Sequence, residues 1–177
     1  MDQLEKDVVF SIGKMRLLHY KPLVPAEQVS SVPTLITYAL VNRQYMMDLQ
    51  PDRSVFKTFL ESGMDLYVID WGYPTGEDMY MTMDDYINWY MNEVVEFIKK
   101  DANVPKINML GICQGATFTT IYTALYPKNV KNIITLVVPI DFSVNDALLF
   151  RWSRFMNIDS LVDAYGVVPG DVMNFSY

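Results

Sequence analysis

The middle of the chain combines a short apolar run, a turn between two glycines and a helical pattern. The run Ile107–Leu110 is long enough for a buried strand, and it leads into Gly111-Ile-Cys-Gln-Gly115. Apolar residues then recur at helical spacing over 118–125. A strand, a G-x-nucleophile-x-G turn and a helix, in that order, form a nucleophile elbow. The pattern therefore predicts Cys113, the only cysteine of the chain, as a nucleophile at a helix N-terminus.

The two glycines of this turn, Gly111 and Gly115, have a steric role. The turn is so sharp that side chains two residues before and after the nucleophile would collide with the neighbouring strand and helix. The dipole of the following helix favours a thiolate at Cys113. A lone cysteine is more often a small buried apolar residue, but the flanking strand and helix favour the nucleophile here.

A cysteine nucleophile needs a base, and the base needs an orienting acid. In this architecture both follow the nucleophile along the chain, yet no histidine follows Cys113. The only histidine, His19, precedes the first core strand, which predicts an ordinary edge or surface residue. Asp70 and Asp141 each follow a strand and are weak candidates for the acid. The sequence therefore predicts the N-terminal part of an enzyme that includes the nucleophile. Either the chain is truncated, or the protein has lost its base.

Stabilisation of an oxyanion requires two backbone amides. One comes from the residue after the nucleophile, here Gln114, and the other from the loop after the first core strand. Thr34–Val41 is rich in β-formers and predicts that strand, so the amide of Val41 is the candidate second donor. The alternative is that residues 42–49 only connect a strand to a helix.

Strands and helices alternate along most of the chain. Further strands are predicted over 64–70 and 130–138, the latter buried, and further helices over 52–63 and 82–100. This alternation is typical of a mainly parallel sheet with helices on both faces. At the N-terminus the pattern predicts a helix over 1–17 and a short edge strand over 17–22. Residues 1–142 would form the core, and 143–177, which lack a clear strand, the start of a cap.

The composition limits the function classes. The chain has 177 residues and a net charge of −7, which argues against nucleic acid as a partner. No apolar run reaches the length of a membrane span, and one cysteine cannot form an internal disulfide or a cysteine-rich metal site. We expect no cofactor and no metal, and a cytoplasmic, reducing setting in which a catalytic thiol survives.

Several segments together resemble the catalytic subunit of two-subunit (class III) polyhydroxyalkanoate synthases, over about residues 15–177. The resemblance is carried by Leu35–Gln50, Tyr67–Pro74, Met83–Ile87, Leu110–Gly115, Val138–Phe142 and Val162–Gly170. It implies an α/β-hydrolase fold, truncated before its C-terminal strands, with cysteine replacing serine on the elbow at Cys113. The catalytic Asp and His of the family lie beyond residue 177 and correspond to no residue here.

The resemblance also implies the reaction and the partners. (R)-3-hydroxyacyl units pass from coenzyme A thioesters to a growing polyester, with release of coenzyme A. The implied partners are an accessory synthase subunit, PhaE in preference to PhaR, and polyester granules in the cytoplasm, with a homo-oligomer as a further option. Two alternatives stay open: a cysteine hydrolase that resembles dienelactone hydrolase, and a truncated module that associates with partners without catalysis.

Overall fold

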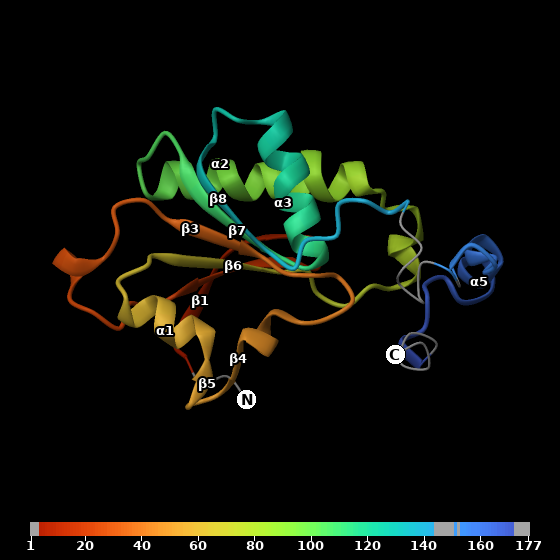
Figure 1. Cartoon of the computed structure of the whole chain (residues 1–177), viewed down its shortest axis with the longest axis horizontal. Coiled ribbons are helices and arrows are strands. Elements are labelled where there is room, and N and C mark those ends of the chain that lie inside the picture. Colours follow the sequence, from red (N-terminus) through yellow and green to blue (C-terminus); the bar gives the residue numbers. More distant parts are fainter. Residues whose placement is uncertain (1–3, 144–150, 152, 172–177) are drawn as a thin grey trace. The chain divides into compact units, whose positions relative to one another are not determined.

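The computed structural model describes residues 4–143, 151 and 153–171. A six-stranded sheet forms the centre of its larger part (Figure 1). In spatial order the strands are β1 (Lys6–Ile12), β2 (Met15–Tyr20), β6 (Leu66–Asp70), β3 (Thr34–Thr37), β7 (Ile107–Ile112) and β8 (Val130–Leu136). Neighbours among β6, β3, β7 and β8 pair in parallel, whereas β2 pairs antiparallel with both β1 and β6.

Helices cover both faces of this sheet. In Figure 1, α1 (Val55–Glu61) lies on one face, and α2 (Asn92–Asp101) and α3 (Gln114–Leu125) lie on the other. The α1 face has a continuous core in which Phe56 and Leu60 of the helix join Ile36, Val68 and Leu110 of three adjacent strands. The predicted mainly parallel sheet with helices on both faces is therefore confirmed.

The remaining elements are short. They are η1 (Ala26–Gln28), η2 (Gln44–Met47), the paired strands β4 (Asp48–Gln50) and β5 (Arg53–Ser54), η3 (Gly76–Tyr80), the π-helical η4 (Asp85–Met91) and α5 (Ile158–Tyr165). Ser54 caps α1 by accepting a hydrogen bond from the Lys57 amide at 2.9 Å. The predicted helix over 82–100 is present, but its first half is π-helical, which the 3.6-residue period could not reveal.

The predicted helix over 1–17 is wrong, because this segment forms the hairpin β1–β2. Ile12 pairs with Met15 across a two-residue loop, and Gly13 has φ +55°, the left-handed geometry that such a hairpin turn requires. Met15 and Leu17 are fully buried because β2 pairs with β6 on its other side. The strand predicted over 17–22 is therefore present but interior, and β1 forms the edge.

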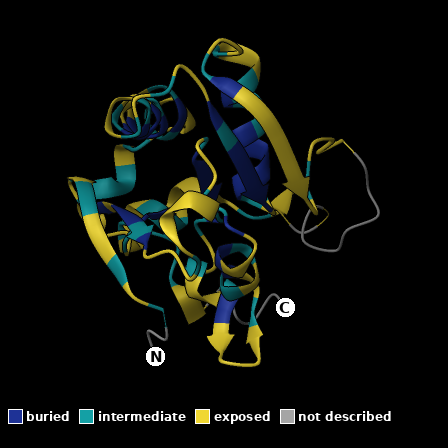
Figure 2. Cartoon of the chain, turned by 90° about the vertical axis from the view of Figure 1, so that its left-hand side faces the viewer, coloured by how far each residue is buried: buried dark blue, intermediate teal, exposed yellow. Residues whose placement is uncertain are grey.

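The prediction of a buried strand over 130–138 is also corrected. β8 forms the opposite edge of the sheet, and every residue of it after Val130 is exposed (Figure 2). Its apolar side chains occur on both faces: Ile133 is 40% exposed and Ile134, on the other face, is 46% exposed. Apolar composition on both faces is typical of an interior parallel strand, which explains why the sequence pattern predicted burial.

The chain divides into two compact units, Met1–Gly72 with Met83–Pro139, and Tyr73–Thr82 with Ile140–Tyr177. The second unit contains η3 and α5, and Gly166, with φ +75°, caps the C-terminus of α5. The division predicted at residue 142 stays a prediction. Residues 144–150, 152 and 172–177 of the predicted cap lie outside the described residues.

Candidate active site

Cys113 lies at a sharp junction between strand and helix. β7 ends at Ile112, α3 begins at Gln114, and Cys113 between them has φ +54° and ψ −128°. A non-glycine residue with positive φ is strained, and such strain persists only where the surrounding structure imposes it. The side chain of Cys113 is exposed. This is the strand–turn–helix geometry of a nucleophile elbow.

Both elbow glycines are sterically required. A Cβ atom at Gly111 would lie 2.4 Å from the Cα of Ala116, and one at Gly115 would lie 2.2 Å from the carbonyl oxygen of Thr37. Both obstacles are backbone atoms, so no side-chain rotation can relieve them. The second contact also brings the start of α3 against the end of β3.

The surroundings of Cys113 are formed by three strand ends. Its amide donates to the Leu136 carbonyl of β8 at 2.9 Å, and its own carbonyl accepts from the Ala116 amide. Tyr38 follows β3, and burial, followed by the charge of the Cys113 thiolate, raises the pKa of its phenol. Gln114 is the first residue of α3, where backbone amides have no intrahelical acceptor.

The loop that carries Val41 follows β3 and is held at three points. The Leu40 amide donates to the side-chain oxygen Oε1 of Gln114 at 3.0 Å. The indole Nε1 of Trp71 donates to the Tyr38 carbonyl at 3.0 Å, and the Arg43 guanidinium donates to the Gly72 carbonyl. The structure thus brings this loop to the elbow through the Gln114 side chain, which sequence reasoning missed.

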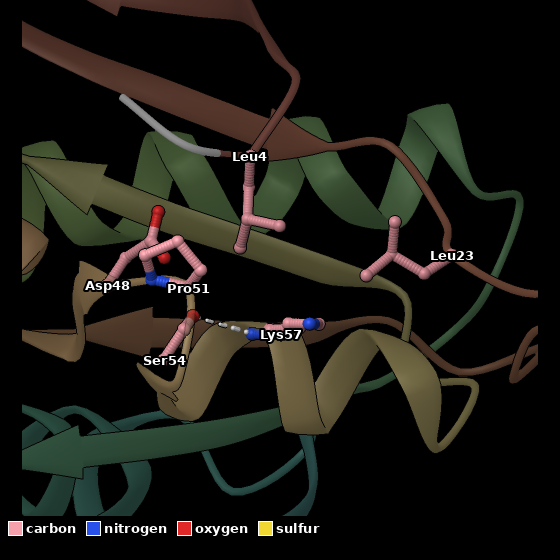
Figure 3. Close-up of a pocket in the computed structure, with 6 residues that line it drawn as sticks. All are labelled: Leu4, Leu23, Asp48, Pro51, Ser54 and Lys57. Atoms are coloured by element: carbon pink, nitrogen blue, oxygen red, sulfur yellow. Dashed lines mark hydrogen bonds between the residues drawn. The ribbon is translucent and has the colours of Figure 1, made fainter. Parts of the chain in front are cut away.

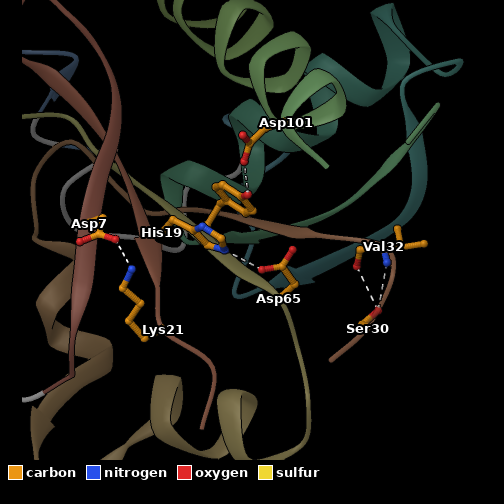
Figure 4. Close-up of polar contacts among 8 residues, drawn as sticks. Asp7, His19, Lys21, Ser30, Val32, Asp65 and Asp101 are labelled. Carbon is orange, nitrogen blue, oxygen red and sulfur yellow. Dashed lines mark hydrogen bonds and ion pairs between the residues drawn. The ribbon is translucent and has the colours of Figure 1, made fainter. Parts of the chain in front are cut away.

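His19 belongs to a separate polar cluster (Figure 4). Its Nε2 lies 2.7 Å from Oδ1 of Asp65, and its ring stacks on Tyr67 with centroids 3.9 Å apart. The Tyr67 hydroxyl donates to Asp101 at 2.8 Å, and burial together with this carboxylate raises the pKa of Tyr67.

The sheet register separates His19 from Cys113. His19 pairs with Tyr67 of β6, which is level with Leu35 of β3 and Met109 of β7. His19 is thus three strands from β7, and Cys113 is four residues beyond Met109. At about 3.3 Å per residue and about 4.8 Å between strands, the two lie on the order of 15–20 Å apart. His19 cannot reach the thiol as a base.

The two carboxylates that follow strands have local partners. Asp70 is buried, and its two oxygens accept from the Arg16 guanidinium and from the Gly72 amide, the latter at 3.0 Å. Asp141 belongs to the second unit and is exposed, and two hydrogen bonds from Ser143 lower its pKa. Asp70 is thus engaged in fixing the segment after β6.

A pocket of about 440 Å³ lies away from the elbow (Figure 3). It is lined by Leu4, Leu23, Asp48, Pro51, Ser54 and Lys57. Within the described part of the chain, no three His, Cys, Asp or Glu residues are grouped to hold a metal ion. None of the helices in that part has the length and apolar character needed to cross a bilayer.

Two family models match the sequence. One is the alpha/beta hydrolase fold, over residues 45–164, and the other is the N-terminus of poly-beta-hydroxybutyrate polymerase (PhaC), over residues 3–59. Solved structures share the fold at low identity. They include the Francisella virulence factor BioJ, with a TM-score of 0.61 and 17% identity over 81% of this chain and 47% of that chain. A putative lipase from Sulfolobus solfataricus has a TM-score of 0.59 and 15% identity over 92% of this chain and 57% of its own.

Curated relatives are more similar in sequence. The poly(3-hydroxyalkanoate) polymerase subunit PhaC of Allochromatium vinosum is 45% identical over 97% of this chain and 48% of its own length. That of Synechocystis is 40% identical over 97% of this chain and 47% of its own length. The chain thus spans about half the length of these relatives. It belongs to the alpha/beta hydrolase fold family, and its relatives within that family are PhaC subunits of poly(3-hydroxyalkanoate) polymerases.

Proposed function

We propose that this chain is the nucleophile-bearing part of a poly(3-hydroxyalkanoate) polymerase, and that Cys113 accepts an (R)-3-hydroxyacyl group from coenzyme A. The observation that carries the proposal is the exposed cysteine held at φ +54° on a strand–helix junction. The similarity to PhaC subunits supports the substrate class. By this similarity, Cys113 would be the residue of this chain that takes part in acyl transfer.

In the proposed acylation, the Cys113 thiolate attacks the carbonyl carbon of the thioester. The tetrahedral oxyanion accepts hydrogen bonds from the amides of Gln114 and Val41. The intermediate then expels coenzyme A as a thiolate, which takes a proton from solvent, and the acyl group remains on Sγ of Cys113. One thioester replaces another, so the step is close to thermoneutral and does not need a strong driving force.

Polymer growth requires a second step, in which the hydroxyl of an acyl chain attacks the acyl-cysteine. A neutral hydroxyl is a weak nucleophile, and a general base supplies about 10²- to 10⁴-fold. His19 is too distant, and Asp70 is held by Arg16. We therefore expect this 177-residue chain to acylate without sustained turnover. An accessory subunit such as PhaE, and attachment to cytoplasmic polyester granules, belong to the same proposal.

The test is to incubate the purified chain with (R)-3-hydroxybutyryl-coenzyme A and to follow free thiol and intact protein mass. We expect at most one coenzyme A released per chain and one acyl adduct on the Cys113 peptide, both absent in Cys113→Ala. Sustained release that Cys113→Ala abolishes would contradict the expected lack of turnover. If free 3-hydroxy acid accumulates with it, the chain is a cysteine hydrolase. If no adduct forms at any pH, the chain is a non-catalytic module.

A further inference from the structure

We infer that the side chain of Gln114 is a positioning residue that holds the two halves of the oxyanion hole together. The inference rests on the proposed function, since it concerns the same site. Gln114 would act twice: its amide donates to the oxyanion, and its side-chain oxygen accepts from the Leu40 amide on the opposite loop. One residue would then fix the distance between both oxyanion donors.

The hydrogen bond from Leu40 to Gln114 selects the second donor. Because the Leu40 amide is already bound at 3.0 Å to Oε1 of Gln114, it is not available for a substrate oxygen. Val41 is the next residue, it is 57% exposed, and its amide has no hydrogen-bond partner among the described residues. The Gln114 side chain therefore directs the loop so that Val41, not Leu40, offers its amide.

The other two fixed points of the loop come from a different segment. Trp71 and Gly72 follow β6 and hold Tyr38 and Arg43 on either side of Val41. Trp71 is 4% exposed, and its ring packs edge-on against Phe118 of α3. These contacts fix the loop relative to β6, whereas the contact from Gln114 fixes it relative to the nucleophile.

The main chain makes this link possible. Gly115 lies so close to the end of β3 that a Cβ atom there would be 2.2 Å from the Thr37 oxygen. The side chain of the preceding residue, Gln114, can therefore reach Leu40, which lies two residues after Tyr38 in the loop. The acceptor belongs to the amide group of glutamine, and an aliphatic residue of similar length would leave the Leu40 amide without this partner.

The experiment compares Gln114→Met, which replaces the acceptor by a weakly accepting thioether, with Gln114→Glu, which keeps an oxygen at the same position. Gln28→Met, at an exposed site in η1, is the matched control. Two rates are measured for each protein at each pH: alkylation of Cys113 by iodoacetamide, and its acylation by (R)-3-hydroxybutyryl-coenzyme A. Alkylation forms no oxyanion, so the ratio of acylation to alkylation reports on the oxyanion hole and cancels any change in the thiolate fraction.

We expect Gln114→Met to lower this ratio by at least about 10-fold, against about 10²- to 10³-fold for complete loss of an oxyanion donor. Gln114→Glu should recover most of it, and Gln28→Met should leave it unchanged. An unchanged ratio in Gln114→Met, or equal losses in Gln114→Met and Gln114→Glu, would overturn the inference.

Hydrogen exchange of the Leu40 amide provides a readout that does not depend on acylation. It should become faster in Gln114→Met than in the parent chain and in Gln28→Met, and unchanged exchange would overturn the inference. If the parent chain is alkylated but never acylated, the proposed function fails, while the exchange result still decides whether Gln114 holds the loop.

Discussion

At the scale of single residues, the elbow is determined by clearances between backbone atoms. Gly111 faces Ala116, and Gly115 faces the Thr37 carbonyl, both at distances that no Cβ atom tolerates. Strain is concentrated on Cys113, the one residue of the turn that has a side chain and positive φ. The position of the thiol is therefore a consequence of two missing side chains.

Replacement of Gly115 by alanine tests this clearance. Alanine gains about 1 kcal/mol in helix propensity over glycine, but forcing a methyl group into a packed site costs about 1–3 kcal/mol. Because the obstacle is a backbone oxygen at 2.2 Å, we expect the steric cost to exceed the gain. Chemical denaturation should show a net loss of about 1 kcal/mol or more. Gly76→Ala is the control, since no atom beyond its two chain neighbours lies within 4 Å of its Cβ position, and an equal loss there would contradict this account.

At the scale of elements, the two edges of the sheet differ. β1 has a mixed composition, with Lys6, Asp7 and Ser11 among its residues, and its partner β2 is interior. β8 has one charged residue, Lys131, near its start, and it then exposes Ile133, Ile134 and Leu136, which lie on both faces of this edge. An exposed apolar edge strand is a template for pairing with another chain, and charged side chains are the usual protection.

We therefore expect the 177-residue chain to self-associate through β8. Ile134→Lys places a charge in the middle of this edge, where Ile134 is 46% exposed, so little core packing is lost. Size-exclusion chromatography over a concentration series should show a larger monomer fraction for this variant. Thr58→Lys adds the same charge on an exposed site of α1 and should behave as the parent chain. If both variants shift equally, net charge and not the β8 edge controls association.

At the scale of the whole molecule, the two helices that cover one face of the sheet are joined to each other and to the start of β8 by buried polar contacts. Tyr122 of α3 is fully buried, and its hydroxyl donates to Asn92 of α2 and accepts from Asn129 before β8. Burial raises the pKa of Tyr122 from 10.0 to about 12. Ionisation of this phenol would place an uncompensated charge between the two helices.

Stability should therefore fall in alkali. Between pH 10 and about 12 the unfolded chain loses the Tyr122 proton while the folded chain keeps it, so the free energy of unfolding decreases as pH rises. The slope from one such group is at most about 1.4 kcal/mol per pH unit. Tyr67, whose pKa is also raised, acts in the same direction. Denaturation at pH 9 to 11.5 should give a shallower slope for Tyr122→Phe than for the exposed control Tyr80→Phe, and equal slopes would refute the assignment.

The sequence by itself determined the local features of this protein. The order of strand, elbow and helix around Cys113, the alternation that gives a parallel sheet, and the cap at Ser54 each depend on residues close together in the chain. The periodicity of apolar residues and the chemistry of glycine and serine are sufficient for such features. The resemblance to PhaC subunits depends on the same local segments, and the comparisons confirm it.

Tertiary structure decided what depends on residues far apart in the chain. The N-terminal segment became a hairpin because β6 offers β2 a partner, and the apolar β8 is exposed because no strand described here lies beyond it. The Gln114 side chain reaches Leu40 across 74 positions of sequence. The distance of His19 from Cys113 follows from the register of four strands. Strand partners and long-range contacts are fixed by hydrogen bonds between strands and by side-chain packing. Neither produces a periodic pattern that can be recognised in one sequence.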